Sequence, residues 1–423
     1  MIWISFATII LIFALAYLTF NKDLFSPCPL FFESFSISLF IAALYKERWG
    51  QGYSFVFYSF IFLHLIVFMF FSAVVKYVVL GKRRVTMQKE INYKIYKFQQ
   101  KTWLLLGIDI LVFALYFYEI YRLAGIYGNT KGISGMFYVY HNKVLLNNDG
   151  SGEQMRTWIV LLFRFSTMLA YYSSYIFLNN LIRARQKLVK NLKWFLFVLV
   201  YWSGVFISSQ RTGIIYHVFA MIFMAYIMMR QKNGWVKGEA VFIKMIQVSV
   251  IVLFASVVGL FTLGNLMGRV SNVNPVDYFA VYCAGSIPNL SKVLSHSGVS
   301  FFMGTTEPIA QHFYSYSGAR ANLYTIFGEI VASEGWLSSL AFSIYISLLY
   351  SIVYYLTIYE RMPSIKSDFF LIVYAYATEG LLMGGLVNVI NNNIITKGFV
   401  LIILGIWFIH YFLVNKKIRI KVR

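Results

Sequence analysis

Long apolar runs recur along the whole chain and constrain its fold more than any other feature. A helix that crosses the hydrocarbon core of a bilayer needs about 20 mostly apolar residues. Runs of about that length occur near 2–20, 27–45, 53–79, 103–121, 158–180, 194–208, 212–229, 245–264, 336–357, 368–389 and 398–414. The pattern predicts an all-α polytopic membrane protein with about eleven spans (range 10–12), forming a single integral membrane domain over residues 1–423.

Composition supports this interpretation. Charged residues make up 13% of the chain and hydrophobic residues 59%, whereas soluble globular domains carry about 25% charged residues. No polar stretch between the apolar runs is long enough to form a separate soluble domain. A bilayer, rather than a protein core, is therefore expected to cover most of the apolar surface.

The charge distribution predicts the orientation. The formal net charge is +21, a value that a nucleic-acid-binding protein could also have. Here the lysines and arginines concentrate in short segments between the apolar runs, at 81–101, 181–193 and 230–244 and in the C-terminal tail. All four fall on one side if the span count is correct, which makes that side cytoplasmic. We therefore expect a cytoplasmic C-terminus, an outside N-terminus and no nucleic-acid partner.

Two long segments, about 122–157 and 265–335, then lie outside. Long loops are more often functional than not. Within the second, Asn274 to Asp277 (Asn-Pro-Val-Asp) predicts a helix start, with Asn as the cap and Pro at the first position. The following stretch, Tyr278 to Cys283, is apolar enough to rest on the membrane surface.

Several common motifs are absent from the sequence. It contains no Walker loop, no Gly-x-Ser-x-Gly, no His-Glu-x-x-His and no Cys-x-x-Cys, so a nucleotide-driven pump is not supported and no cofactor is expected. No Asp-x-Asp or histidine cluster offers a metal site. The two cysteines, Cys28 and Cys283, fall on opposite membrane faces in this topology, which predicts no disulfide.

A few charges lie inside the predicted spans. A charge at the bilayer centre costs about 2.5–3.5 kcal/mol on insertion scales, so such residues usually face a cavity or a partner. Each alone fits a buried ion pair or a snorkelling side chain as well as a functional role. Gly380 and Gly384, four residues apart, predict close helix packing. The charges in question are Glu33, Asp109, Glu119, Arg164 and Glu379.

Arg211 is the most informative residue. It lies in Ser208 to Gly213 (Ser-Ser-Gln-Arg-Thr-Gly), at the predicted outer start of the seventh span. A helix that begins there directs free N–H groups and its positive dipole end outward, which favours an anion. Guanidinium binds phosphate oxygens through two parallel hydrogen bonds. The alternative is an interfacial arginine bonded to lipid phosphate or a carboxylate.

Three further arginines reach the same predicted face: Arg269 and Arg320 in the long segment, and Arg164 in the outer half of the fifth span. Together with Arg211 they predict an outward-facing site for a diphosphate. A general base for a sugar hydroxyl would be a carboxylate or histidine, and the sequence does not choose among the candidates. They are Asp277, Glu307, His312, Glu329 and Glu334.

The sequence resembles the bacterial O-antigen (oligosaccharide repeat-unit) polymerases, the Wzy family, over most of its length. Leu24 to Pro27 resembles the family's serine–proline entry to the second span, and Ser209 to Gly213 its small–Arg–small helix start. Asn322 to Thr325, followed by Ser333 to Gly335, resembles its Asn…Thr…Asp-x-Gly segment. Glu334 departs from the pattern, because the family has aspartate there.

This resemblance implies a GT-C-like membrane glycosyltransferase that acts without a metal. It would join undecaprenyl-pyrophosphate-linked oligosaccharides, which serve as both donor and acceptor, at the periplasmic face of the inner membrane. It would work within membrane lipid, beside a chain-length regulator protein. The candidate catalytic residues are Arg211, Arg320, Arg269 and Glu334, and the candidate substrate-binding residues are Arg164, Ser209, Asn322, Glu329 and His312.

Three other functions compete with this interpretation. An O-antigen ligase shares the donor and the arginine chemistry, and only the motifs favour a polymerase. A lipid-linked oligosaccharide flippase or other transporter would be expected to show repeated halves and midplane charges, and no repeat is visible. A membrane acyltransferase would need a histidine-centred motif, whereas the histidines here are scattered.

Overall fold

The structure of the chain is a computed structural model. The part of the chain that it describes comprises residues 2–50, 52–81, 93–128, 132–145, 153–208, 211–233, 235, 262, 274–295, 299–305, 314–316, 319–321 and 324–414. The chain divides into two compact units. Unit 1 comprises Met1–Met87, Asn272–Arg361 and Ala377–Ile395, and unit 2 comprises Gln88–Ser271, Met362–Tyr376 and Thr396–Arg423.

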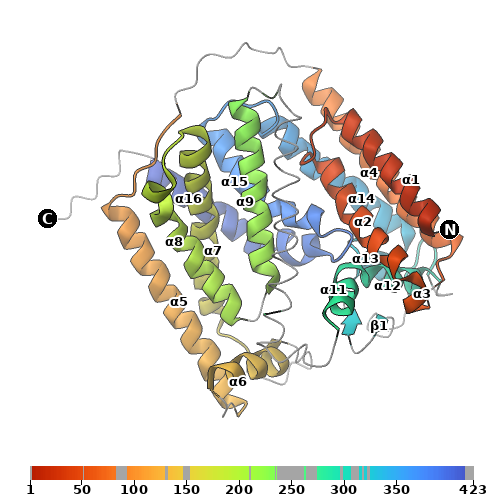
Figure 1. Ribbon diagram of the computed structural model, residues 1–423, viewed down its shortest axis with the longest axis horizontal. Helices are drawn as coiled ribbons and strands as arrows, with labels where there is room; N and C mark the ends of the chain where they lie inside the picture. Colours follow the sequence, from red (N-terminus) through yellow and green to blue (C-terminus); the bar gives the residue numbers. More distant parts are fainter. Residues whose placement is uncertain are drawn as a thin grey trace. The chain divides into compact units, whose positions relative to one another are not determined.

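Unit 1 is built on four long helices that run side by side (Figure 1). They are α1 (Ile2–Thr19), α2 (Pro27–Leu44), α4 (Phe55–Leu80) and α14 (Trp336–Thr357), and the short helix α3 (Lys46–Trp49) follows α2. Small polar side chains line the contact between α4 and α14. Buried serines recur every fourth residue along α14, so the two helices approach closely without glycine. They are Ser339, Ser343, Ser347 and Ser351.

These serines let the two helices approach closely and bond to each other, as small polar residues do between membrane helices. Ser351 Oγ donates to Ser72 Oγ at 3.0 Å, and Ser343 Oγ donates to the His64 carbonyl at 3.2 Å. The His64 ring lies 2.9 Å from Ser339 Oγ. The α4–α14 contact is therefore polar at intervals, although both helices are apolar overall.

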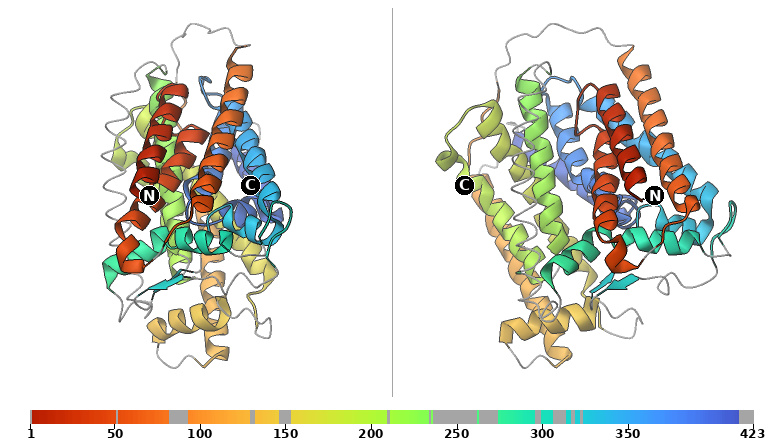
Figure 2. Two further views of the ribbon diagram at one scale, coloured as in Figure 1. Left: turned by 90° about the vertical axis from the view of Figure 1, so that its right-hand side faces the viewer. Right: turned by 45° about the vertical axis from the view of Figure 1, so that its right-hand side comes forward.

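The segment that precedes α14 contains short elements. They are α11 (Pro275–Ala284), α12 (Ser286–Leu294), a hairpin of β1 (Tyr314–Tyr316) and β2 (Ala319–Ala321), and α13 (Gly328–Glu334). Helices α11 and α12 lie across the long helices of unit 1 (Figure 2). The predicted helix start is confirmed, because Asn274 Oδ1 accepts from the Val276 N–H at 2.9 Å and Pro275 opens α11. Cys283 on α11 and Cys28 on α2 are free thiols, and burial raises the pKa of Cys283 to about 12.

Unit 2 is a second helical bundle. Its long helices are α5 (Gln100–Ile126), α7 (Thr157–Leu178), α8 (Leu188–Ile207), α9 (Arg211–Lys232) and α16 (Lys397–Val414). Helix α7 packs against the other four and continues into a π-helix, η2 (Asn179–Arg183). Helix α6 (Gly132–Val139) and the π-helix η1 (Tyr140–Leu145) lie at the end of α5 (Figure 1).

The chain is an all-α polytopic membrane protein, apart from the short β1–β2 hairpin. Among the described residues, seven helices are long and apolar enough to cross a membrane: Pro27–Leu44, Phe55–Leu80, Gln100–Ile126, Thr157–Arg183, Leu188–Ile207, Thr212–Lys232 and Trp336–Thr357. Helices α1 and α16 coincide with two further predicted spans but are apolar over shorter lengths. The predicted span at 245–264 lies outside the described residues, apart from Thr262.

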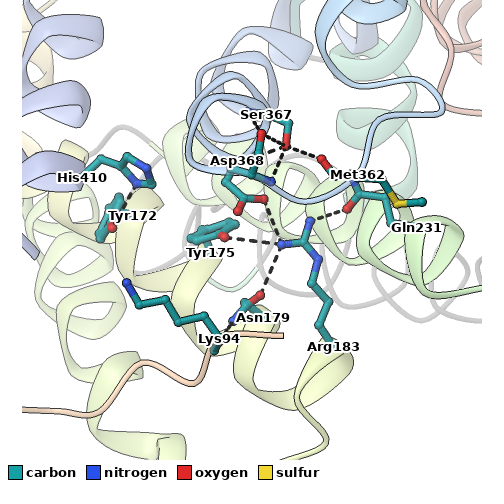
Figure 3. Close-up of polar contacts among 11 residues, drawn as sticks. Lys94, Tyr172, Tyr175, Asn179, Arg183, Gln231, Met362, Ser367, Asp368 and His410 are labelled. Atoms are coloured by element: carbon teal, nitrogen blue, oxygen red, sulfur yellow. Dashed lines mark hydrogen bonds and ion pairs between the residues drawn. The ribbon is translucent and has the colours of Figure 1, made fainter. Parts of the chain in front are cut away.

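A buried polar network in unit 2 joins η2, α9 and the start of α15 (Ile365–Leu382), as Figure 3 shows. Arg183 Nη1 donates to Asp368 Oδ1 at 2.9 Å, and only 1% and 10% of these side chains are exposed. Gln231, Asn179 and Tyr175 accept further hydrogen bonds from the same guanidinium. The Arg183 charge is thus paired with a carboxylate within the protein, although Arg183 belongs to segment 181–193, one of the four basic segments that predict the orientation.

Candidate functional site

Unit 1 contains a helix break after α15. The helix ends at Leu382, a turn follows, and a π-helix, η4 (Ile390–Ile394), leads to α16. The apolar pattern predicted a span over 368–389, so its last third is wrong. Gly384 and Gly385 explain the early end, since glycine destabilises a helix interior by roughly 1 kcal/mol relative to alanine.

Other parts of unit 1 satisfy the polar backbone groups of this break. The Gly385 N–H donates to Ser34 Oγ on α2, and the Gly385 carbonyl accepts from Ser286 Oγ at 2.7 Å. The Gly384 carbonyl accepts from the Ile326 N–H at 2.7 Å. Ser34 lies near the middle of α2, a candidate span. Irregular backbone at membrane depth is tolerated only where protein buries it or where it lines a cavity.

The close packing predicted for the glycines is confirmed. A Cβ at Gly380 would lie 2.6 Å from the Tyr350 hydroxyl, and one at Gly384 would lie 2.6 Å from the Phe31 ring. Gly385 is more constrained, because its Cβ would lie 2.6 Å from the Ser34 carbonyl oxygen and 2.9 Å from the carbonyl carbon. These are backbone atoms that cannot rotate away, so the break tolerates only glycine there.

We expect Gly385→Ala to destabilise the protein by about 1–3 kcal/mol, the usual effect of overpacking. The measurement is thermal unfolding of detergent-purified protein. Gly107→Ala in α5 is the matched control, since a Cβ there meets nothing within 4 Å and alanine is the better helix former. An unfolding midpoint for Gly385→Ala equal to that of the parent would contradict the tight contact with α2.

Two carboxylates border the break, and an asparagine amide holds each. Glu379, buried on α15, accepts from Asn393 Nδ2 at 3.2 Å. Glu329, half-buried on α13, accepts from Asn388 Nδ2 at 3.0 Å. Burial, and after it the charge of Glu329, raises the pKa of the nearby Tyr324 phenol to about 12. The carboxylate oxygens can accept hydrogen bonds from hydroxyl groups of a ligand, and the amide N–H groups can donate hydrogen bonds to hydroxyl oxygens.

Phe327 fixes the position of Glu329. This fully buried ring lies 4.3 Å from the His64 ring and 5.8 Å from the rings of Phe31 and Phe35, measured between centroids. The turn before α13 is thereby inserted between α2 and α4. Part of the segment that the sequence predicted as an outer loop is therefore packed among the long helices.

The structure separates the candidate bases. Glu334 ends α13 and is exposed, whereas Glu329, five residues earlier on the same helix, contacts the break. Asp277 lies 3.5 Å from Arg48 in an ion pair. His312 and Glu307 lie outside the described residues. Among the described candidates, Glu329 is the one that packing and hydrogen bonding hold in place.

Two of the predicted arginines lie in unit 2. Arg211 is the first residue of α9, as predicted. Arg164 lies on α7 with its guanidinium against Gly398, where a Cβ would be 1.9 Å from Nη1. Phe163, next to Arg164, and Ile214, in the first turn of α9, pack against the same cluster of Ala170, Tyr201 and Val205. Arg164 therefore lies near the helix start at Arg211.

Of the remaining predicted site residues, only Arg320 lies in the described part of the chain. Arg320 lies in β2 of unit 1, opposite Ser315. Arg269, Ser209 and Asn322 lie outside the described residues. Of the charges predicted inside spans, Glu119 fits the ion-pair interpretation, since it lies 2.8 Å from Arg122.

Sequence reasoning missed Asn388 and Asn393. The available signal was the asparagine-rich stretch Asn388 to Asn393 inside an apolar run. Asparagine disfavours a helix interior because its side chain competes for backbone hydrogen bonds. This stretch follows Gly384 and Gly385. Two glycines followed by several asparagines inside an apolar run indicate a helix break.

In the described part of the chain, no three His, Cys, Asp or Glu side chains gather as metal ligands would. Comparison of the chain with protein-family models, with curated proteins and with solved structures finds no match. The function is therefore inferred from the residues themselves.

Proposed function

We propose that the protein is a membrane glycosyltransferase that polymerises undecaprenyl-pyrophosphate-linked oligosaccharide repeat units into O-antigen. The observation that carries the proposal is the Glu329–Asn388 pair at the break of unit 1. A glutamate side chain held by an amide donor can bind a sugar hydroxyl and act as a general base. The motif resemblance and the helical membrane architecture support the same reaction.

In this reaction the acceptor's sugar hydroxyl attacks the anomeric carbon of the donor sugar. Glu329 takes the hydroxyl proton as the new glycosidic bond forms. The bond between the anomeric carbon and the phosphate oxygen breaks, and undecaprenyl pyrophosphate leaves with the bonding electrons. Arg211 and Arg164 are the residues that the sequence proposes for stabilising the charge of the leaving diphosphate.

The proposed setting is the bacterial inner membrane, with a cytoplasmic C-terminus, a GT-C-like fold and chemistry at the periplasmic face. Its basis is the grouping of lysine and arginine in four segments. A chain-length regulator is the proposed protein partner. Co-purification from native membranes tests that partnership, and a consistently solitary protein would count against it.

Arg211→Ala is expected to lower polymerase turnover by about 10²–10³-fold, the usual effect of removing one group that stabilises developing negative charge. Expression and thermal stability should stay at the parental level. Arg185→Ala serves as the control and should keep full activity, because it removes an exposed arginine that lies just after η2. A normal elongation rate in Arg211→Ala would show that the diphosphate lies elsewhere.

One observation favours a second candidate. Broken helices with polar groups beside the break are typical of transporters, and α15 ends in such a break. A lipid-linked oligosaccharide flippase is therefore the alternative.

Gene deletion, followed by gel analysis of lipopolysaccharide, distinguishes these functions. A polymerase deletion leaves a single repeat unit on the core. Loss of every repeat-bearing band indicates a flippase or an O-antigen ligase. An unchanged ladder rejects all three.

A further inference from the structure

Three large apolar side chains stand exposed in succession outside the long helices. Phe301 is 49% exposed, Phe302 73% and Met303 67%. They form a turn between Ser300 and Gly304, here named the apolar turn, and no charged residue occurs in the described stretch 299–305 around it. Single exposed apolar residues are common, but a contiguous group marks a surface that another phase or molecule covers.

The apolar turn is firmly held. The Ser300 N–H donates to the Met303 carbonyl at 2.8 Å, which closes the turn. The Phe301 and Phe302 rings pack edge to face with centroids 5.0 Å apart. Gly335 has φ +89° and lies so close that a Cβ there would be 2.7 Å from the Met303 nitrogen. The three side chains are therefore presented by a fixed backbone.

Hydrogen bonds join the apolar turn to the first residues of α14. The Trp336 N–H donates to the Ser300 carbonyl at 3.2 Å, and the Leu337 N–H donates to the Phe301 carbonyl at 2.9 Å. The turn thus satisfies two N–H groups that a helix start leaves free. Leu337 is 46% exposed on α14, a candidate membrane span. The exposed apolar turn is thus bonded to the first turn of a candidate span that itself carries an exposed apolar side chain.

We infer that the apolar turn inserts into the bilayer at the leaflet where α14 begins, with Phe301, Phe302 and Met303 among the lipid acyl chains near the headgroups. Apolar groups on a non-spanning segment bind lipid at this depth. The occupant is lipid because the turn is bonded to the first turn of a span. This inference does not depend on the proposed reaction.

Insertion would also position the candidate site. The Thr305 N–H, just after the turn, donates to the Ala332 carbonyl of α13 at 2.7 Å. A Cβ at Gly304 would lie 2.3 Å from the same oxygen. Helix α13 carries Glu329, so insertion of the turn would anchor this carboxylate at the membrane surface.

Spin labelling tests the inference on the full chain in phosphatidylethanolamine–phosphatidylglycerol nanodiscs. Cys28 and Cys283 are first replaced by alanine, and a nitroxide is attached to Phe302→Cys or, separately, Met303→Cys. Label accessibility to oxygen, which enters the acyl region, is compared with accessibility to a water-soluble nickel chelate. Leu337→Cys gives the lipid-facing reference, and Glu47→Cys on α3, an exposed charged position, gives the aqueous one.

The expected result is high oxygen and low nickel accessibility at 302 and 303, matching position 337. Nickel accessibility equal to that at position 47 would place the turn in water and overturn the inference. Low accessibility to both reagents would mean that protein covers the turn, either a second copy or a partner, and would also overturn it. The two label sites guard against a local effect of one substitution.

Discussion

Glu329→Gln is expected to reduce polymer formation by about 10²–10⁴-fold, the usual contribution of a positioned general base. Glutamine keeps the size of the side chain and can still accept the Asn388 amide hydrogen bond at its oxygen. It cannot take a proton from an attacking hydroxyl. The loss should therefore be a loss of turnover with little change in thermal stability.

The measurement is elongation of a purified lipid-linked repeat unit by the reconstituted protein. Glu334→Gln is the matched control, because this exposed carboxylate lies on the same short helix, α13. We expect it to retain activity within a few fold. Equal losses of activity in the two variants would mean that the reaction depends on the total negative charge of α13 and not on a positioned base at Glu329. Full activity in Glu329→Gln would assign proton transfer to another residue.

Arg183→Ala is expected to destabilise the protein by about 3–5 kcal/mol, because it leaves the Asp368 carboxylate buried without its partner. The change should appear as a large drop in the thermal unfolding midpoint of detergent-purified protein. Arg185→Ala is the control. It removes an arginine two residues away that is exposed, and it should change stability by less than about 0.5 kcal/mol.

Replacing both partners distinguishes the destabilising effect of an unpaired buried charge from the effect of lost packing. The Arg183→Met, Asp368→Leu double variant removes both charges and keeps apolar volume. It should recover a large part of the stability lost in Arg183→Ala, since replacing a buried pair by apolar residues is often neutral or stabilising. A double variant that is no more stable than Arg183→Ala would show that the unpaired Asp368 carboxylate is not what destabilises the single variant.

The sequence predicted most long helices because their apolar runs are uninterrupted, as in α4 and α14. It did not predict where α15 ends. Hydropathy averages over a window, so Gly384 and Gly385 hardly lower it, although they stop the helix. Charge counting likewise cannot distinguish an exposed Arg185 from a buried Arg183, because burial depends on residues far apart in the chain.

The candidate site was only partly predictable for the same reason. The start of α9 at Arg211 follows from local sequence. The choice of Glu329 over Glu334 does not, because it depends on Phe327 entering between α2 and α4. A single aromatic residue in a short segment produces no periodic signal.

The contact between α4 and α14 also has a consequence for biogenesis. Ser72 and Ser351, which bond across it, are 279 positions apart in the chain. At about 5–20 residues per second, synthesis of the partner helix lags by roughly 15–55 s. During that interval His64 and Ser72 on the newly inserted α4 lack their α14 neighbours. We expect the nascent protein to depend on an insertase or chaperone that shields this helix face until α14 emerges from the ribosome.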